Sequence, residues 1–194
     1  MNPALEASLA FAGIDLSPGQ ASQLGNLGEW LRVEALPAGG IGPGEGPRID
    51  DRHLADSIVF AAAWKAAPKR CWDLGTGAGL PGLVLAILWP SCRFTLIDRS
   101  ARKIDLVRRA ARLVEVEIET RVAPIASLEG PVEAVVSRAA MPATAFLPHL
   151  RRILAPGGRA VVSGSGIAVP GYEEMIVPPG ILDHSARLLM MRAQ

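Results

Sequence analysis

The sequence predicts one α/β unit, a mostly parallel β-sheet with helices on both faces, preceded by N-terminal helices. From position 69 onward, short apolar runs alternate with helical periods, as in a parallel sheet covered on both faces. The first run leads into a glycine-rich stretch, Cys71 to Gly82 (CWDLGTGAGLPG), and the second run ends in Asp98 (RFTLID). Glycines after one strand and an acid after the next are expected at the carboxyl edge of such a sheet, where ligands bind.

Length and composition allow one domain with a full core and a small helical extension, because the chain has 194 residues, 49% of them hydrophobic. Its formal charge of +1 argues against a general polyanion binder, so any nucleic-acid site is expected to be local. The N-terminus lacks a basic leader, and the longest apolar run, Leu83 to Trp89, stops at Pro90. We therefore expect neither secretion nor a membrane span, which leaves the cytoplasm.

Cys71 and Cys92 lack metal-ligand spacing, so we expect two core thiols and no metal site.

The first third of the chain predicts helices joined by a loop. Amphipathic patterns indicate helices over residues 3–13 and 18–36. The segment 37–47 (PAGGIGPGEGP) has too many Gly and Pro residues for a helix or strand, which predicts a mobile loop. Asp50 or Asp51 is then a plausible N-cap for a helix that runs through Lys65.

The sequence of residues 67–194 predicts the sheet and the helices that cover it. Residues 1–66 are expected to form a helical extension of the same compact unit. Strands are expected where short apolar runs occur, at 70–74, 93–98, 116–122, 132–137 and 159–163. Helices are expected between them, at 81–89, 101–114 and 143–155. Two weaker strand candidates, 174–177 and 186–192, would form a terminal hairpin.

The glycine loop has the features of a ligand site. Glycines let the backbone turn tightly and lie against a ligand that a Cβ atom would push away. Pro81 suits the first turn of the following helix, where its missing N–H costs nothing. Asp98 stands 21 residues after Gly77 and can accept hydrogen bonds from the hydroxyls of a ribose. Both NAD and adenosylmethionine contain an adenosine ribose, so Asp98 alone does not choose between them.

Three other features favour adenosylmethionine over NAD. Asp73 stands two residues before the first glycine, where a carboxylate would repel the pyrophosphate of NAD but suits a sulfonium and an ammonium group. The chain has no room for the second catalytic domain that most dehydrogenases carry. The stretch 149–163 (HLRRILAPGGRAVVS) predicts a helix, a Pro-Gly-Gly turn and a strand, which is typical of adenosylmethionine-dependent methyltransferases.

These residues resemble the glucose-inhibited division protein B family, also called the ribosomal RNA small subunit methyltransferase G family, which methylates N7 of a guanine in bacterial 16S ribosomal RNA. The Arg-His-x-x-Asp-Ser element followed by Asp-x-Gly-Thr-Gly-x-Gly-x-Pro-Gly is quite specific to this family. The matching segments run in order through nearly the whole chain: AGIDLSPGQASQL near the start, RHLADSIV at 52–59, DLGTGAGLPG at 73–82, FTLIDRSARKIDLVRR at 94–109, VSRAAMP at 136–142 and the closing ARLLMMRA.

The resemblance implies a class I methyltransferase fold, which is Rossmann-like, with adenosylmethionine as methyl donor and the small ribosomal subunit as partner. In this sequence Asp73, Gly75, Thr76, Gly77, Gly79 and Pro81 would form the cofactor loop, and Asp98 would hold the ribose. Arg138 would lie at the edge shared by cofactor and substrate, although a salt bridge at the sheet edge is the alternative for this residue. Arg102 and Lys103 would face the RNA. Guanine N7 has a lone pair and no proton, so no general base is required and no catalytic residue is assigned. We expect a monomer.

The chain also departs from the family pattern. The loop 37–47 replaces an Asn-Leu-Thr element, the sequence SGSG at 163–166 replaces a Lys-Gly pair, and RVAPIAS at 121–127 lacks an expected acid. These losses leave open a diverged paralogue that binds adenosylmethionine but acts on another substrate or is inactive.

Other polar and aromatic residues have two interpretations. The basic residues around the helix at 101–114 could form a solvated face or contact phosphates, and they are Arg99, Arg102, Lys103, Arg108, Arg109 and Arg112. His53 and Asp56 could belong to the site, but we favour a cap and a satisfied side chain at a helix start. The tryptophans, Trp30, Trp64, Trp72 and Trp89, are expected in the core rather than as base-stacking platforms.

Overall fold

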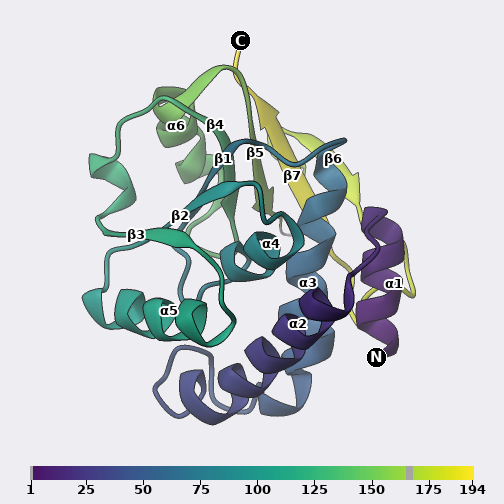
Figure 1. The fold of residues 1–194 in the computed structure, drawn as a ribbon. Helices are drawn as coiled ribbons and strands as arrows, with labels where there is room; N and C mark the ends of the chain where they lie inside the picture. The colour runs from purple at the N-terminus through teal and green to yellow at the C-terminus, as the bar shows by residue number, and fades with distance from the viewer. Residues whose placement is uncertain (1, 165–167) are drawn as a thin grey trace.

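A seven-stranded sheet in the order β3-β2-β1-β4-β5-β7-β6 forms the centre of the computed structural model, which describes residues 2–164 and 168–194 (Figure 1). The strands are β1 (Arg70–Leu74), β2 (Arg93–Asp98), β3 (Ile118–Val122), β4 (Val132–Ser137), β5 (Leu154–Ser163), β6 (Glu173–Ile176) and β7 (Arg187–Arg192). Strands β1 to β5 pair in parallel, and β7 pairs antiparallel with both β5 and β6. The predicted mostly parallel sheet and terminal hairpin are therefore confirmed.

Within residues 2–164 and 168–194, six α-helices accompany the sheet: α1 (Pro3–Ala12), α2 (Pro18–Trp30), α3 (Ala55–Ile58), α4 (Gly82–Leu88), α5 (Ala101–Leu113) and α6 (Ala143–Ile153). Shorter helical segments are the π-helical η1 (Leu31–Ala35) and η3 (Ile49–Leu54) and the 3-10 segments η2 (Gly46–Arg48), η4 (Val59–Ala63) and η5 (Ile125–Ser127). Of the helices in the described ranges, none is both long and apolar enough to span a bilayer.

The N-terminal helices begin where the sequence supplies caps. The Asn2 side chain accepts a hydrogen bond from the backbone N–H of Ala4, and Ser17 and Gln20 form a reciprocal capping box at the start of α2. The Gln20 side chain also donates to the carbonyl of Ile87 at 2.8 Å. The same residue thus starts α2 and ties it to α4.

Each face of the sheet has its own hydrophobic cluster. Side chains such as Cys71, Phe94 and Val136 pack with α4, α5 and the N-terminal helices on one face. Alternate positions such as Leu74 and Ile97 pack with α6 on the other. Because the first cluster runs without interruption from α1 into the sheet, the N-terminal extension shares the core of the α/β part (Figure 1).

The segment before β1 differs from the predicted capped helix. Instead of one helix from Asp50 or Asp51 to Lys65, residues 49–63 form η3, α3 and η4 in succession. Neither acid caps η3, since the Asp50 carboxylate binds Arg32 at 2.6 Å and the Asp51 carboxylate accepts from the Asn2 side chain at 2.8 Å. The two carboxylates therefore bind side chains from other parts of the fold instead of the backbone N–H groups at the start of η3.

The glycine- and proline-rich segment 37–47 has no regular structure before η2, as predicted, but it is anchored to the core. The Ile41 side chain is buried, and the Gly40 N–H donates to the carbonyl of Ala35 at 2.7 Å. The loop therefore has a defined path along the N-terminal helices and α5.

The predicted Pro-Gly-Gly turn lies within β5. Val132 of β4 pairs with Leu154, and Ala134 pairs with Arg159, so two steps along β4 match five along β5. The extra residues bulge out around Gly157, whose φ of +73° lies in the left-handed region that favours glycine. Helix α6 accordingly ends at Ile153, two residues earlier than predicted, and the chain passes directly into the strand.

Candidate functional site

The glycine loop joins β1 to α4 at the carboxyl edge of the sheet. Gly75, Gly77 and Gly79 have φ values of +71°, +61° and +94°, which L-residues rarely adopt. A Cβ atom added to Gly75 would lie 2.4 Å from Ala140 Cβ, and one on Gly79 would lie 2.3 Å from Leu83 Cδ1. At Gly77 the nearest atom would be 4.0 Å away, so this glycine borders open space rather than packed protein.

The buried Asp73 side chain binds both ends of the glycine loop. One carboxylate oxygen, Oδ2, accepts hydrogen bonds from Thr76 Oγ1 at 2.6 Å and from the Gly82 N–H at 2.8 Å. The other, Oδ1, is buried and has no partner among the described residues. Burial raises the pKa of Asp73 to about 6, although the bonds from Thr76 and Gly82 oppose that shift. Asp73 therefore ties the loop to the start of α4, with one acceptor left unmatched.

Asp98 faces the same loop from the end of β2, as its position in the sequence predicts. Its Oδ2 accepts a hydrogen bond from the Gly77 N–H at 3.1 Å, and its Oδ1 accepts from the Ser100 N–H at 2.9 Å. The residue is 7% exposed. Since each carboxylate oxygen can accept two hydrogen bonds, Asp98 retains capacity for a ligand beside Gly77.

Arg138 follows β4 and lies close enough to the loop for its charge to lower the pKa of Asp73. Its guanidinium contacts Asp56 Oδ2 at 3.3 Å, the Arg52 carbonyl at 3.4 Å and His53 Nδ1 at 3.1 Å. His53 Nε2 in turn lies 3.1 Å from Glu45 Oε2. The Arg-His-x-x-Asp-Ser element thus surrounds Arg138 at the edge of the sheet.

The structural role that we favoured for His53 and Asp56 is correct in one part and wrong in the other. Both side chains are hydrogen-bonded, as expected of satisfied side chains, and both direct polar atoms toward Arg138. Neither is a cap, because no side chain among the described residues caps η3 or α3. Glu45 was not a candidate from the sequence, because it lies in the segment 37–47, whose glycines and prolines predicted only a loop. The one available signal was the position of this acid shortly before the Arg-His pair.

Arg102 and Lys103 occupy the first turn of α5, which Ser100 caps by accepting from the Lys103 N–H at 3.4 Å. No anionic partner contacts either side chain in the part of the chain that the structure describes. The Arg102 guanidinium lies beside the loop at Gly39, 3.6 Å from where a Cβ atom would stand. The basic pair is therefore free to meet an external anion.

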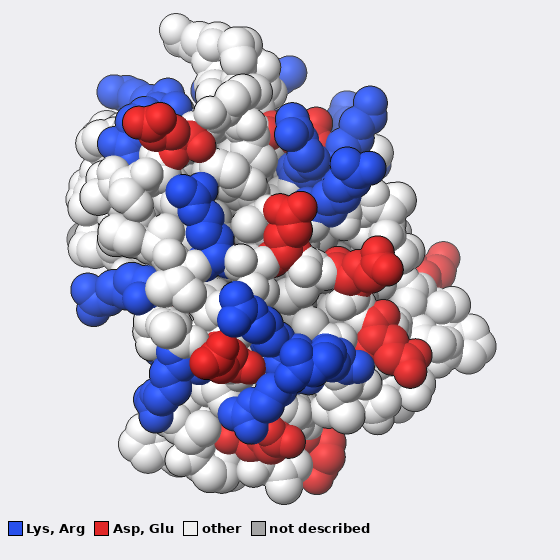
Figure 2. Space-filling view, turned by 60° about the vertical axis from the view of Figure 1, so that its left-hand side comes forward, with Lys and Arg blue, Asp and Glu red and all other residues white. Residues whose placement is uncertain are grey.

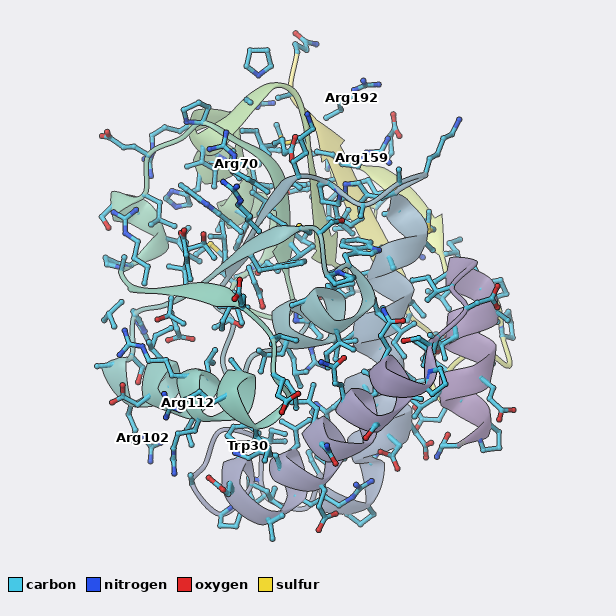
Figure 3. All side chains as sticks on the ribbon, in the orientation of Figure 1. Trp30, Arg70, Arg102, Arg112, Arg159 and Arg192 are labelled. Carbon is cyan, nitrogen blue, oxygen red and sulfur yellow. The ribbon has the colours of Figure 1, made fainter. Side chains whose placement is uncertain are left out.

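The other basic residues of α5 were expected either to form a solvated face or to contact phosphates. Arg108 pairs with Asp105 at 3.2 Å and Arg109 with Glu34 at 3.1 Å, as on a solvated face. Arg102 and Arg112 lie on α5 at the lower left of Figure 3. Figure 2 shows lysine and arginine side chains over both the upper and the lower parts of the face it presents, with acidic side chains among them. The ion pairs of Arg108 and Arg109 leave the other basic residues of α5 as the candidates for any phosphate contact.

Of the four tryptophans expected in the core, Trp30 is buried, and the other three, Trp64, Trp72 and Trp89, are partly buried and pack against the hydrophobic clusters. Trp30 is 3% exposed at the end of α2 (Figure 3), and Trp64 and Trp89 meet edge to face at 5.5 Å. Cys71 and Cys92 are buried free thiols. In the described ranges, no group of three His, Cys, Asp or Glu side chains could hold a metal ion.

The segment where the family pattern has a Lys-Gly pair is described only in part. Ser163 Oγ accepts a hydrogen bond from the Ala139 N–H at 3.0 Å, next to Arg138. Ser165 and Gly166, the second half of SGSG, lie outside the described residues.

Comparison with solved structures identifies the fold. A ribosomal protein methylase from Lactobacillus delbrueckii subsp. bulgaricus superposes with a TM-score of 0.57 at 17% identity, covering 74% of this chain and 80% of the other. MtNAS superposes with a TM-score of 0.60 at 15% identity, covering 91% of this chain and 72% of the other. At these identities the likeness concerns the fold alone, which is the class I methyltransferase fold, with its antiparallel seventh strand between the fifth and sixth.

Comparison of sequences identifies the family. The GidB family model, described as rRNA small subunit methyltransferase G, matches residues 37–165. The protein of that name from Leptothrix cholodnii is 33% identical, covering 99% of this chain and 97% of its own length. The one from Leifsonia xyli subsp. xyli is 30% identical, covering 91% and 96%. This chain belongs to the rRNA small subunit methyltransferase G family.

Proposed function

We propose that the protein transfers a methyl group from adenosylmethionine to N7 of a guanine in small-subunit (16S) ribosomal RNA. The observation that carries the proposal is the intact glycine loop, with Asp73 and Asp98 in place, in a chain that aligns with its family over nearly its whole length. The relatives carry the name of an rRNA methyltransferase, and the substrate proposed here follows from that membership. The site would act in the cytoplasm on the small ribosomal subunit, with the protein as a monomer.

The residues around the loop suit adenosylmethionine better than NAD. Open space borders Gly77, and Asp98 beside it offers a carboxylate to the ribose hydroxyls. The unmatched Asp73 Oδ1 adds a buried acceptor, which suits a positively charged ligand and opposes a pyrophosphate. The proposed cofactor site consists of Asp73, Gly75, Thr76, Gly77, Gly79, Pro81, Asp98 and Arg138. Asp73 and Thr76 contribute by shaping the loop, since both are buried.

The proposed reaction asks the protein for alignment rather than proton transfer. When bound, adenosylmethionine supplies an electrophilic methyl group, and guanine N7 presents a lone pair with no proton to remove. Binding energy spent on holding the two partners in line then supplies the rate enhancement. Arg138 lies beside the cofactor loop, where it would orient the base, and Arg102 and Lys103 would hold the RNA backbone through phosphate contacts.

The direct test incubates the purified protein with methyl-labelled adenosylmethionine and small ribosomal subunits that lack the modification. Label at guanine N7 is expected with the wild-type chain and not with Gly77→Val, whose side chain would fill the space beside the loop. A standard family member serves as positive control. If cofactor binds but no label reaches N7, the proposed substrate is wrong and a diverged paralogue becomes the better explanation. If adenosylmethionine binds no better than NAD, the cofactor assignment fails as well.

A further inference from the structure

The Arg138 side chain is held by partners from one short stretch of chain before the sheet. Its guanidinium donates to the Arg52 carbonyl, the Asp56 carboxylate and His53 Nδ1, at 3.4, 3.3 and 3.1 Å. The side chains of Arg138, Asp56 and His53 are only 16%, 18% and 11% exposed. Competition from water is therefore weak, and these contacts decide where the guanidinium points.

The two ring nitrogens of His53 have different neighbours, and these neighbours determine which nitrogen carries the hydrogen. A guanidinium has only donors, so His53 Nδ1 must present a lone pair to Arg138. A carboxylate has only acceptors, so His53 Nε2 must carry the hydrogen that faces Glu45 at 3.1 Å. Only the neutral ring with its proton on Nε2 satisfies both contacts. An imidazolium would turn an N–H toward the guanidinium.

The surroundings of His53 favour that neutral form. Burial lowers the pKa of His53, and the charges of Arg138 and Arg52 lower it further, whereas the hydrogen bond and charge of Glu45 raise it. Asp56 contacts the other terminal nitrogen of the Arg138 guanidinium, and it also approaches His184 Nε2 at 3.8 Å. His53 is therefore expected to stay neutral at pH 7, accepting a hydrogen bond from Arg138 through Nδ1 and donating one to Glu45 through Nε2.

We infer that His53 is a positioning residue for Arg138: Glu45 fixes the tautomer of His53, and His53 Nδ1 fixes the direction of the guanidinium beside the glycine loop. Asp56 supplies the countercharge but binds the other terminal nitrogen, so it cannot replace the third contact. The loop 37–47 acquires a role here, because it carries Glu45. The inference rests on the proposed function for its kinetic test and on the contacts alone for its spectroscopic test.

The kinetic test compares two amides of different length at position 53. In His53→Asn the amide can reach the place of Nδ1 and keep an acceptor toward Arg138, whereas in His53→Gln it reaches the place of Nε2 and Glu45. We expect kcat for subunit methylation to fall roughly tenfold or more in His53→Gln and His53→Ala and about threefold or less in His53→Asn, as for loss of one hydrogen bond to a charged group. Cofactor affinity should change less than threefold in all three. His184→Gln, which does not touch Arg138, is the matched control.

A merely structural histidine would give a different order. Activity would then follow the melting temperatures of the variants, and His53→Asn would be no better than His53→Gln. Either result, with an active wild-type protein and a neutral control, overturns the inference. An inactive wild-type protein would instead count against the proposed function and leave the next measurement decisive.

The second test is nitrogen NMR of the imidazole rings, which needs no activity because the chain has only three histidines. For His53 we expect the neutral Nε2–H tautomer at pH 7, a pKa below the ordinary value, a rise of that pKa in Arg138→Leu and a fall in Glu45→Gln. A ring that is protonated at pH 7, or one with its hydrogen on Nδ1, would refute the assignment.

Discussion

Substituting alanine for Gly75 or Gly77 separates the two reasons why a glycine is needed in the loop. Both residues have φ near +65°, at +71° and +61°, so an added side chain costs each variant about 1–2 kcal/mol of backbone strain. Gly75→Ala also places Cβ 2.4 Å from Ala140, an overlap that typically costs a further ~1–3 kcal/mol. Gly77→Ala meets no atom within 4 Å except Gly75 O at 4.0 Å. Gly75→Ala should therefore be the less stable protein.

The assay is urea denaturation of both variants, followed by calorimetric titration with adenosylmethionine. Because about 1 kcal/mol corresponds to roughly 2–4 °C in a protein of this size, the melting temperatures should separate as well. Gly77→Ala should remain folded but bind the cofactor at least about tenfold more weakly, since its Cβ enters the space proposed for the ligand. Equal stability losses would show that the space beside Gly77 is not open. Unchanged affinity in folded Gly77→Ala would show that the cofactor does not lie there.

Three further predictions follow from contacts at the same edge. Asp98→Ala should weaken adenosylmethionine binding by about 1.5–3 kcal/mol in titration calorimetry, roughly 10- to 150-fold, through loss of hydrogen bonds to a charged group. Unchanged affinity in a folded variant would remove the ribose assignment. Asp73 has a pKa raised from 3.8 to about 6, so its contribution to stability is fully present below about pH 4 and is lost as the pH rises through about 6. Urea denaturation should therefore show Asp73→Asn gaining stability relative to wild type, by up to about 3 kcal/mol, between about pH 4 and 7, and a pH-independent difference would contradict the raised pKa. Replacing Arg102 and Lys103 with alanine should weaken subunit binding and reduce the salt dependence of that binding in filter-binding assays, without changing cofactor affinity. Arg109 pairs with Glu34, so Arg109→Ala should change neither subunit binding nor its salt dependence.

The elements that could be predicted are those whose signals lie within a few residues. The alternation of apolar runs predicted the parallel strands, and the position of Asp98 after β2 predicted its approach to Gly77, which the structure has at 3.1 Å. Glycines with positive φ were predictable for the same reason, since tight turns are determined locally. These features needed no knowledge of the distant parts of the chain.

The failures concern carboxylates and histidines whose partners are remote in sequence. Asp50 has the residue type of an N-cap, yet it binds Arg32, 18 positions away. His53 contacts Arg138, 85 positions away, and no local pattern could show which nitrogen faces it. Side-chain pairing between distant segments depends on how the helices pack against the sheet. The periodicity of the sequence carries no information about that packing.

By itself, the sequence determined the order of strands and helices, the glycine loop with its two acids, and the family, because periodic burial and short motifs are written in neighbouring residues. The tertiary structure alone decided that Asp73 ties the loop from within, that the space beside Gly77 is open, and that Glu45, His53 and Asp56 converge on Arg138. These are contacts between segments brought together only by folding. Their burial, which sets the strength of each hydrogen bond and the pKa of each acid, exists only once the sheet and its helices have packed.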